Sequence, residues 1–282
     1  MSVSKMDATR SGAVQPTLRL CATAWSLRQY PTEDEEWSWP RKFAAIAEAG
    51  FDGLMSPPLP ELAERGELIY WAISSFGVGH DPRPFYDEAT ALGAATATVQ
   101  PCDVDTPLDD CVQVMRRVQE VAREYDLHTG IECHRDCFTE TPERTYDMYD
   151  GYVTAEGRPL PLCFDHSHYA VVRHLKHPYW PDLKGREELL APTRQFHMRP
   201  FNGHHCQIPA TFDGEERTPE YLEWLEYARE LFRFIKANGE GEIFVVPELG
   251  NANPAYGLSC FPDVWRDACV TGADLRQAWA EV

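Results

Sequence analysis

The sequence predicts a single (β/α)₈ barrel, an α/β fold of the TIM type, from three observations. Short apolar segments rich in β-branched and aromatic residues recur eight times along the chain. Amphipathic helical patterns separate most of these segments, as in a parallel sheet covered by helices. The chain of 282 residues, 43% of them hydrophobic, has enough material for one barrel. An open doubly wound sheet is the alternative, but eight units favour closure.

The eight predicted strands are each too short to be a typical helix. They comprise residues 18–26, 51–56, 68–75, 94–101, 127–134, 160–166, 194–200 and 242–248. Residues 1–16 are predicted to form a flexible N-terminal tail, and residues 17–282 a single barrel domain with a C-terminal extension.

Capping residues and apolar spacing predict the helices. Thr32 and Glu35 form a capping-box pattern before a helix that continues to Ala49 and ends at Gly50. Two further helices are predicted from Leu108 to Tyr125 and from Thr218-Pro219 onward, and the last begins at Pro262 and continues to Val270. The inner face of the helix after Thr218 is predicted to consist of Leu222, Leu225, Phe232 and Ile235.

Composition narrows the class of protein. A net charge of −19 disfavours nucleic acid as a partner, because the surface repels phosphates. Nine scattered cysteines, with no C-x-x-C pair, indicate reduced thiols in a cytoplasmic protein. There is no signal-like apolar region near the first residue and no membrane-length apolar run, so no membrane association is expected.

Four consecutive predicted strands end in side chains that can bind metal. They are Glu132, Asp165, His197 and Glu248. Chemistry in barrels occurs at the carboxyl ends of the strands, and the ends of neighbouring strands converge. Each residue alone has an ordinary structural explanation, but four such coincidences in a row indicate one metal site. Three carboxylates and an imidazole suit Mn²⁺, Mg²⁺ or Co²⁺ better than a structural zinc ion.

These residues resemble the motifs of the xylose isomerase-like barrels, a superfamily of sugar isomerases, epimerases and related lyases. The segments Glu132-Cys133-His134-Arg135, Asp165-His166-Ser167-His168 and His197-Met198-Arg199 are similar to its E-x-H, D-x-x-H and H-x-R elements. The resemblance extends from Leu18 to Gly250. Arg199 follows His197 more closely than the substrate-binding arginine does in the best-known sugar epimerases. The segment from Gly203 to Gln207 also departs from their pattern.

The resemblance implies one divalent cation, Mn²⁺ first, with Mg²⁺, Co²⁺ and Zn²⁺ as alternatives. It implies that all four strand-end residues are ligands and that Glu132 and Glu248 also act as acid and base. His134, His168, Arg199 and Gln207 are expected to contact the substrate.

The expected function is isomerisation or epimerisation of a sugar or sugar-derived substrate, by proton abstraction and return through an enediolate. A lyase or dehydratase on the same site, including one that removes a sugar from an aglycone, is the alternative. An endonuclease or a binding-only barrel fits the charge and the intact ligand set less well. A homo-oligomer is possible under any of these.

Two further expectations concern aromatic residues. Trp25 and Trp71 are expected to pack in the core rather than line the pocket. The long loop from Asn251 to Phe261 follows the strand that carries Glu248, so Tyr256 or a neighbour is expected to cover the active site.

Overall fold

The computed structural model describes residues 15–250, 261 and 263–282, in which eight parallel strands form a closed barrel. The strands pair in chain order, and β8 pairs with β1. They are β1 (Thr17–Thr23), β2 (Gly53–Ser56), β3 (Ile69–Phe76), β4 (Ala94–Pro101), β5 (Thr129–Glu132), β6 (Leu162–Asp165), β7 (Gln195–His197) and β8 (Glu242–Val246). Each lies within or overlaps a predicted strand, and the predicted fold is confirmed.

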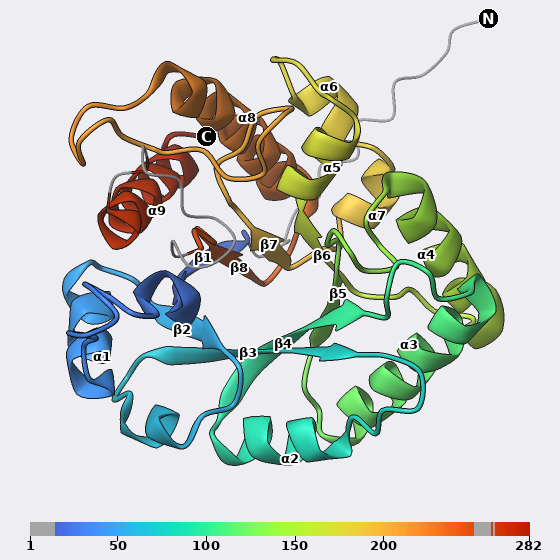
Figure 1. Cartoon of the computed structure of the whole chain (residues 1–282). Coiled ribbons are helices and arrows are strands. Elements are labelled where there is room, and N and C mark those ends of the chain that lie inside the picture. Colours follow the sequence, from blue (N-terminus) through green and yellow to red (C-terminus); the bar gives the residue numbers. More distant parts are fainter. Residues whose placement is uncertain (1–14, 251–260, 262) are drawn as a thin grey trace, which may run out of the picture.

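Helices surround the barrel (Figure 1). They are α1 (Trp39–Glu48), α2 (Arg83–Ala91), α3 (Leu108–Glu124), α4 (Pro142–Glu156), α5 (His166–Val172), α6 (Trp180–Leu183), α7 (Glu187–Leu190), α8 (Pro219–Asn238) and α9 (Val264–Glu281). Two short 3₁₀ helices, η1 (Ala24–Leu27) and η2 (Pro60–Glu64), follow β1 and β2. The connection from β2 to β3 thus has η2 where the other units have α-helices.

The predicted start of the first helix is wrong. The backbone N–H of Glu35 donates to the carbonyl of Thr32 in a turn, and α1 begins after Ser38. A helix that started at Thr32 would hold Pro40 in its interior, where a proline lacks the N–H donor and its ring clashes with the preceding turn. With Ser38 as N-cap, Pro40 falls in the first turn, where it is tolerated. The predicted end at Gly50 is confirmed by its φ of 78°.

Two other helix predictions need correction. Leu222 is 49% exposed, although Leu225, Phe232 and Ile235 are buried as predicted. The last helix is longer than predicted, from Val264 to Glu281, and it begins where the side chain of Asp263 caps Arg266. Of its buried residues after Val270, only Leu275 has a large apolar side chain, so apolar spacing alone did not reveal the extension.

The inside of the barrel is filled beneath the carboxyl ends of its strands. The indole of Trp71 donates to the Thr98 hydroxyl at 2.9 Å, and that hydroxyl lies 3.1 Å from Oε1 of Gln195. A side chain at Gly130 would overlap the Gln195 amide, since a Cβ there would lie 2.0 Å from Oε1. Trp71 is fully buried, as predicted, and its ring lies 5.4 Å from that of His197. A packed layer therefore supports the strand ends from below.

Two predicted segments lie largely outside the described residues. The N-terminal tail is described only at residues 15 and 16, and the loop with Tyr256 only at residue 261. Within the described part of the chain, no helix is both long and apolar enough to cross a membrane.

Candidate metal centre and its cavity

The four predicted ligands meet at the carboxyl end of the barrel. Glu132, Asp165 and His197 are the last residues of β5, β6 and β7, and Asp165 and His197 are register partners. Glu248 lies two residues beyond the end of β8, so the strand is shorter than predicted. One ligand atom of each residue lies within 4.8 Å of those of the other three. Their exposed fractions range from 0 to 6%.

The separations of these atoms fit a shared cation. His197 Nδ1 lies 2.9 Å from Glu132 Oε1 and 3.1 Å from Glu248 Oε2. Adjacent ligands of an octahedral ion that is about 2.1 Å from each would lie about 3.0 Å apart. Apart from these close contacts, Oε2 of Glu132 and Nε2 of His197 are buried without a hydrogen-bond partner among the described residues. Buried polar atoms normally have partners, so this group is suited to hold an ion.

Electrostatics around His197 also favour a positive charge at this point. Burial disfavours the protonated imidazole, but the neighbouring Cys163, Glu132 and Glu248 raise the pKa of His197 well above its ordinary value. The pocket therefore attracts either a proton or a metal ion. A divalent ion would neutralise the same carboxylates through coordination and would leave the imidazole neutral.

Arg199 lies against two of the ligands. Its Nη2 is 2.7 Å from Glu248 Oε2 and 3.2 Å from Asp165 Oδ2, and its guanidinium carbon is 5.6 Å from the Trp25 ring centroid. Burial raises the pKa of Glu248, but Arg199 and His197 more than offset this and lower it to about 2. Asp165 also stays ionised, because His168 and Arg199 overcome its burial and hold its pKa well below the usual range. Both carboxylates are thus kept in the form that binds metal.

Two more histidines lie beside the ligands. Asp165 caps α5 by accepting from Ser167 N, and this places Nε2 of His168 3.2 Å from its other oxygen. Burial lowers the pKa of His168 despite the Asp165 charge, which favours the neutral ring. The His134 ring lies 4.4 Å from that of His168, and its Nδ1 faces the carbonyl of Arg135. The two imidazoles therefore form one edge of the site.

Gln207 is hydrogen-bonded to the backbone next to the site. Its amide oxygen accepts from Gly250 N at 2.7 Å, and its amide nitrogen donates to Gly250 O at 3.1 Å. This pair of bonds fixes the backbone two residues beyond Glu248. The sequence assigned Gln207 to the substrate; the described geometry connects it to the segment that positions Glu248.

A cavity of 630 Å³ opens beside the metal centre and is lined by Glu248 and His134. Trp25, which the sequence assigned to the core, lines this cavity. Sequence reasoning missed Trp39 and Lys42, which line it from the first turns of α1. The signal that could have found them was the Ser38 cap with Pro40, because a helix starting there places Trp39 and Lys42 near the barrel mouth.

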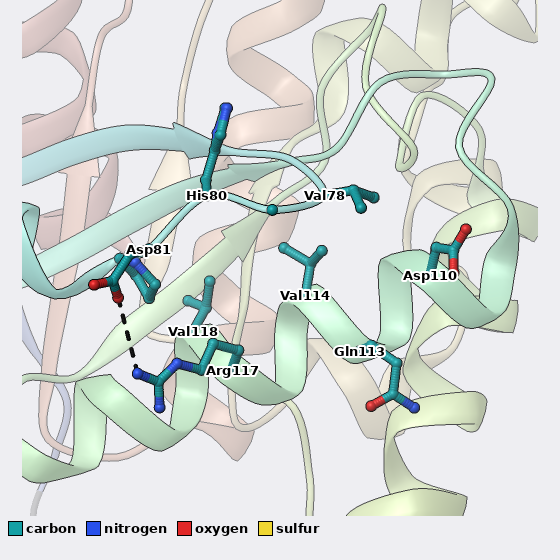
Figure 2. A pocket seen from close by; sticks show the side chains of 10 residues that line it. Val78, His80, Asp81, Asp110, Gln113, Val114, Arg117 and Val118 are labelled. Atoms are coloured by element: carbon teal, nitrogen blue, oxygen red, sulfur yellow. Dashed lines mark ion pairs between the residues drawn. The ribbon is translucent and has the colours of Figure 1, made fainter.

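A second hollow lies elsewhere. A groove of 420 Å³ is lined by residues of α3 and of the segment after β3. Figure 2 shows these side chains and the ion pair between Asp81 and Arg117, whose atoms lie 3.8 Å apart. None of the predicted site residues lines it. The cavity beside Glu248 is therefore the one that belongs to the candidate active site.

We expect Mn²⁺ or Mg²⁺, at about 100 times its dissociation constant, to raise the melting temperature by about 5–10 °C, because it binds only the folded site. Thermal melts with graded metal after chelation measure this. Asp165→Asn should lose the shift, and Glu223→Gln, on the exposed face of α8, should keep it. The metal site would be contradicted if no divalent ion that is tested changed the melting curve of the chelated protein.

Comparisons with known proteins agree with this architecture. The sequence matches no protein-family model, and no curated protein matches it by sequence. The structure is similar to D-allulose 3-epimerase from Methylomonas sp. in complex with D-allulose, at 13% identity and a TM-score of 0.59, covering 95% of this chain and 98% of that one. It is similar to 3-keto-D-glucoside 4-epimerase YcjR from E. coli, at 14% identity and a TM-score of 0.54, covering 93% and 100%.

A third similar structure is a xylose isomerase-like TIM barrel protein from Mycobacterium smegmatis in complex with magnesium. It has 13% identity and a TM-score of 0.53, covering 94% of this chain and 98% of that one. Identities this low establish the fold alone. The resemblance to xylose isomerase-like barrels is thus confirmed at the level of the fold, over nearly the whole chain.

Proposed function

We propose that this protein is a divalent-metal-dependent isomerase or epimerase that acts on a sugar or sugar-derived substrate. The observation that carries the proposal is the convergence of Glu132, Asp165, His197 and Glu248, all buried, beside a cavity large enough for a small molecule. The similar structures named after epimerases of D-allulose and of a 3-keto-glucoside support the substrate class. We propose Mn²⁺ as the ion. Mg²⁺, which is present in the third similar structure, is the first alternative.

The bound cation would supply stabilisation of the negative charge that develops on the substrate oxygens when a neighbouring carbon loses its proton. Glu132 and Glu248 would take and return that proton. They come from β5 and from the end of β8, on either side of His197, so they can serve two faces of one substrate. His134, His168 and Arg199 would bind its hydroxyl and carbonyl oxygens.

The test combines metal analysis with isotope exchange. Purified protein should contain about one divalent ion, and a panel of ketoses and keto-sugars in D₂O should give products with deuterium on the carbon skeleton. If the products have lost water or an aglycone and no isomer is formed, the protein is a lyase or dehydratase that uses the same carboxylates. Bound sugar without exchange or product would indicate a binding protein.

An endonuclease is less well supported. Among the described residues only one group of side chains can hold a metal ion. The net charge of −19 also repels a phosphate backbone. The eight described cysteines are free thiols, and on that basis we propose a cytoplasmic protein.

His168→Ala is expected to lower kcat/KM by about 10- to 100-fold while the metal content stays unchanged. Nε2 of His168 lies 3.2 Å from Asp165 Oδ2, whereas its Nδ1 is buried without a hydrogen-bond partner in the described structure, and this suits a contact between Nδ1 and a substrate oxygen. Kinetics and metal analysis of the same preparation measure the two quantities. His204→Ala, at an exposed position, is the matched control. Loss of metal from the His168 variant would show that His168 is a ligand instead.

A further inference from the structure

The cavity beside the metal centre is not polar throughout. Its polar part comes from Glu248, His134 and their neighbours, where a sugar would be held. The part formed by η1, the start of α1, the end of β2 and the segment before η2 is largely apolar. The apolar side chains that line the cavity are Ala24, Trp25, Trp39, Met55, Pro57, Leu59 and Ile73.

The apolar part adjoins the reacting groups. Trp25 packs against Gly250 so closely that a Cβ there would lie 2.4 Å from its ring. Gly250 is two residues beyond Glu248, and the Arg199 guanidinium that contacts Glu248 is also 5.6 Å from the Trp25 ring. A ligand with one end at the metal ligands would therefore extend directly onto Trp25.

The charges in the wall are balanced. Lys42 has a side chain only 4% exposed, its ammonium forms an ion pair with Glu36, and it lies 4.8 Å from the centroid of the Trp39 ring. Its charge is therefore already neutralised. The charged residues that line the cavity comprise three cations (Arg28, Lys42, Arg135) and three carboxylates (Glu36, Asp136, Glu248). With equal numbers of cations and carboxylates, the lining has no excess positive charge that would favour a phosphate or carboxylate ligand.

The volume of the cavity also favours a ligand that is larger than a single sugar. Pockets for drug-sized ligands measure about 300–1,000 Å³. The 630 Å³ of this cavity exceeds the need of a single free sugar in such a pocket. A free sugar has hydroxyls on nearly every carbon and would leave the Trp39 and Leu59 side uncovered, whereas an apolar ring would displace water from it.

We propose that the substrate is a neutral keto-glycoside, with a ketone on its sugar ring that makes the neighbouring C–H acidic, whose apolar, ring-bearing aglycone occupies the wall formed by Trp25, Trp39 and Leu59. The sugar ring would lie at the metal ligands. This inference rests on the proposed function for the sugar half. The aglycone half depends only on the wall.

Equilibrium binding to the Mn²⁺-loaded full chain tests the proposal, with matched methyl and phenyl β-glycosides of glucose, galactose and xylose as probes. Calorimetry should show a phenyl glycoside binding about tenfold or more tightly than its methyl partner, the effect expected when one aromatic ring is buried. Trp39→Ala and Leu59→Ala should each reduce that ratio at least severalfold and leave methyl glycoside affinity nearly unchanged. Trp37→Ala is the control, because Trp37 is a neighbouring tryptophan that does not line the cavity.

The outcomes separate the two proposals. Equal affinities for methyl and phenyl partners in every pair, or a phenyl preference that survives both wall variants, would overturn the aglycone site. Phenyl preference that disappears in Leu59→Ala but persists in Trp37→Ala supports it even where Trp39→Ala fails to fold. Deuterium exchange into free sugars with no phenyl preference would leave the proposed function standing and reject this inference alone. Absence of binding by every glycoside would also reject the inference. If, in addition, no deuterium were exchanged into any sugar, the proposed function would fail too.

Discussion

Glu248→Gln is expected to reduce turnover by about 10²- to 10⁴-fold while the fold and most of the bound metal remain. The amide oxygen can still ligate an ion, but it cannot accept the substrate proton. Glu248 is the one ligand that also lines the cavity, so it is the carboxylate best placed to reach a substrate carbon. Its partners Arg199 and His197 keep it ionised, since they lower its pKa to about 2.

The measurement pairs deuterium exchange with metal analysis, so that loss of the proton acceptor is distinguished from loss of the ion. Glu223→Gln makes the same chemical change on the exposed surface of α8 and should retain full turnover. A Glu248→Gln protein that keeps its metal and turns over normally would restrict Glu248 to ligation. The proton would then have to be moved by Glu132.

The barrel and the convergence of the four candidate ligands could be predicted because both depend on short-range features of the sequence. A strand of about five residues is recognisable from its apolar run, and the residue at its end is then assigned to the active face. Asp165 and His197 needed only this, since each ends its strand. Glu248 was assigned to a strand that stops at Val246, yet the error did not matter because the backbone continues toward the same mouth.

Side-chain direction was harder to predict. The sequence could place Arg199 near the site but not show that its guanidinium lies between Asp165 and Glu248, because this depends on packing from other strands. The substrate contact expected of Gln207 came from the resemblance, and its pairing with Gly250 is a contact between distant segments that the sequence does not show.

Whether Trp39 and Lys42 could be predicted to line the cavity depended on where the first helix begins. Starting the helix at Thr32 placed Lys42 in mid-helix, where a lysine is expected to be solvated. The constraint from Pro40 moves it to the first turn, beside Trp39 and the cavity. This proline, weighed correctly, would have placed Trp39 and Lys42 at the start of the helix.

Arg199→Met is expected to destabilise the metal-free protein by roughly 3–5 kcal/mol, the usual cost of removing one partner from a buried ion pair. Nη2 of Arg199 lies within 3.2 Å of both Asp165 and Glu248, so the guanidinium compensates charge that a divalent ion would otherwise neutralise. The same substitution should make Mn²⁺ bind about tenfold or more tightly, because a fixed positive charge beside the ion has been removed. The stabilisation that the metal confers should therefore be larger in the variant than in the parent protein.

Denaturant unfolding with chelator gives the stability of the metal-free protein, and unfolding with saturating Mn²⁺ gives the stabilisation that the metal confers. Calorimetric titration gives the Mn²⁺ affinity. Arg199→Lys is the matched control. A single nitrogen of Arg199 contacts both carboxylates, so an ammonium can take its place and should keep the Mn²⁺ affinity close to that of the parent. If Mn²⁺ bound more weakly to Arg199→Met than to the parent, Arg199 would be holding Glu248 and Asp165 in position for the ion, and its charge would not be the deciding property. Tighter binding in the Met variant but not in the Lys variant would identify Arg199 as a built-in counter-cation that sets how strongly the site holds its metal.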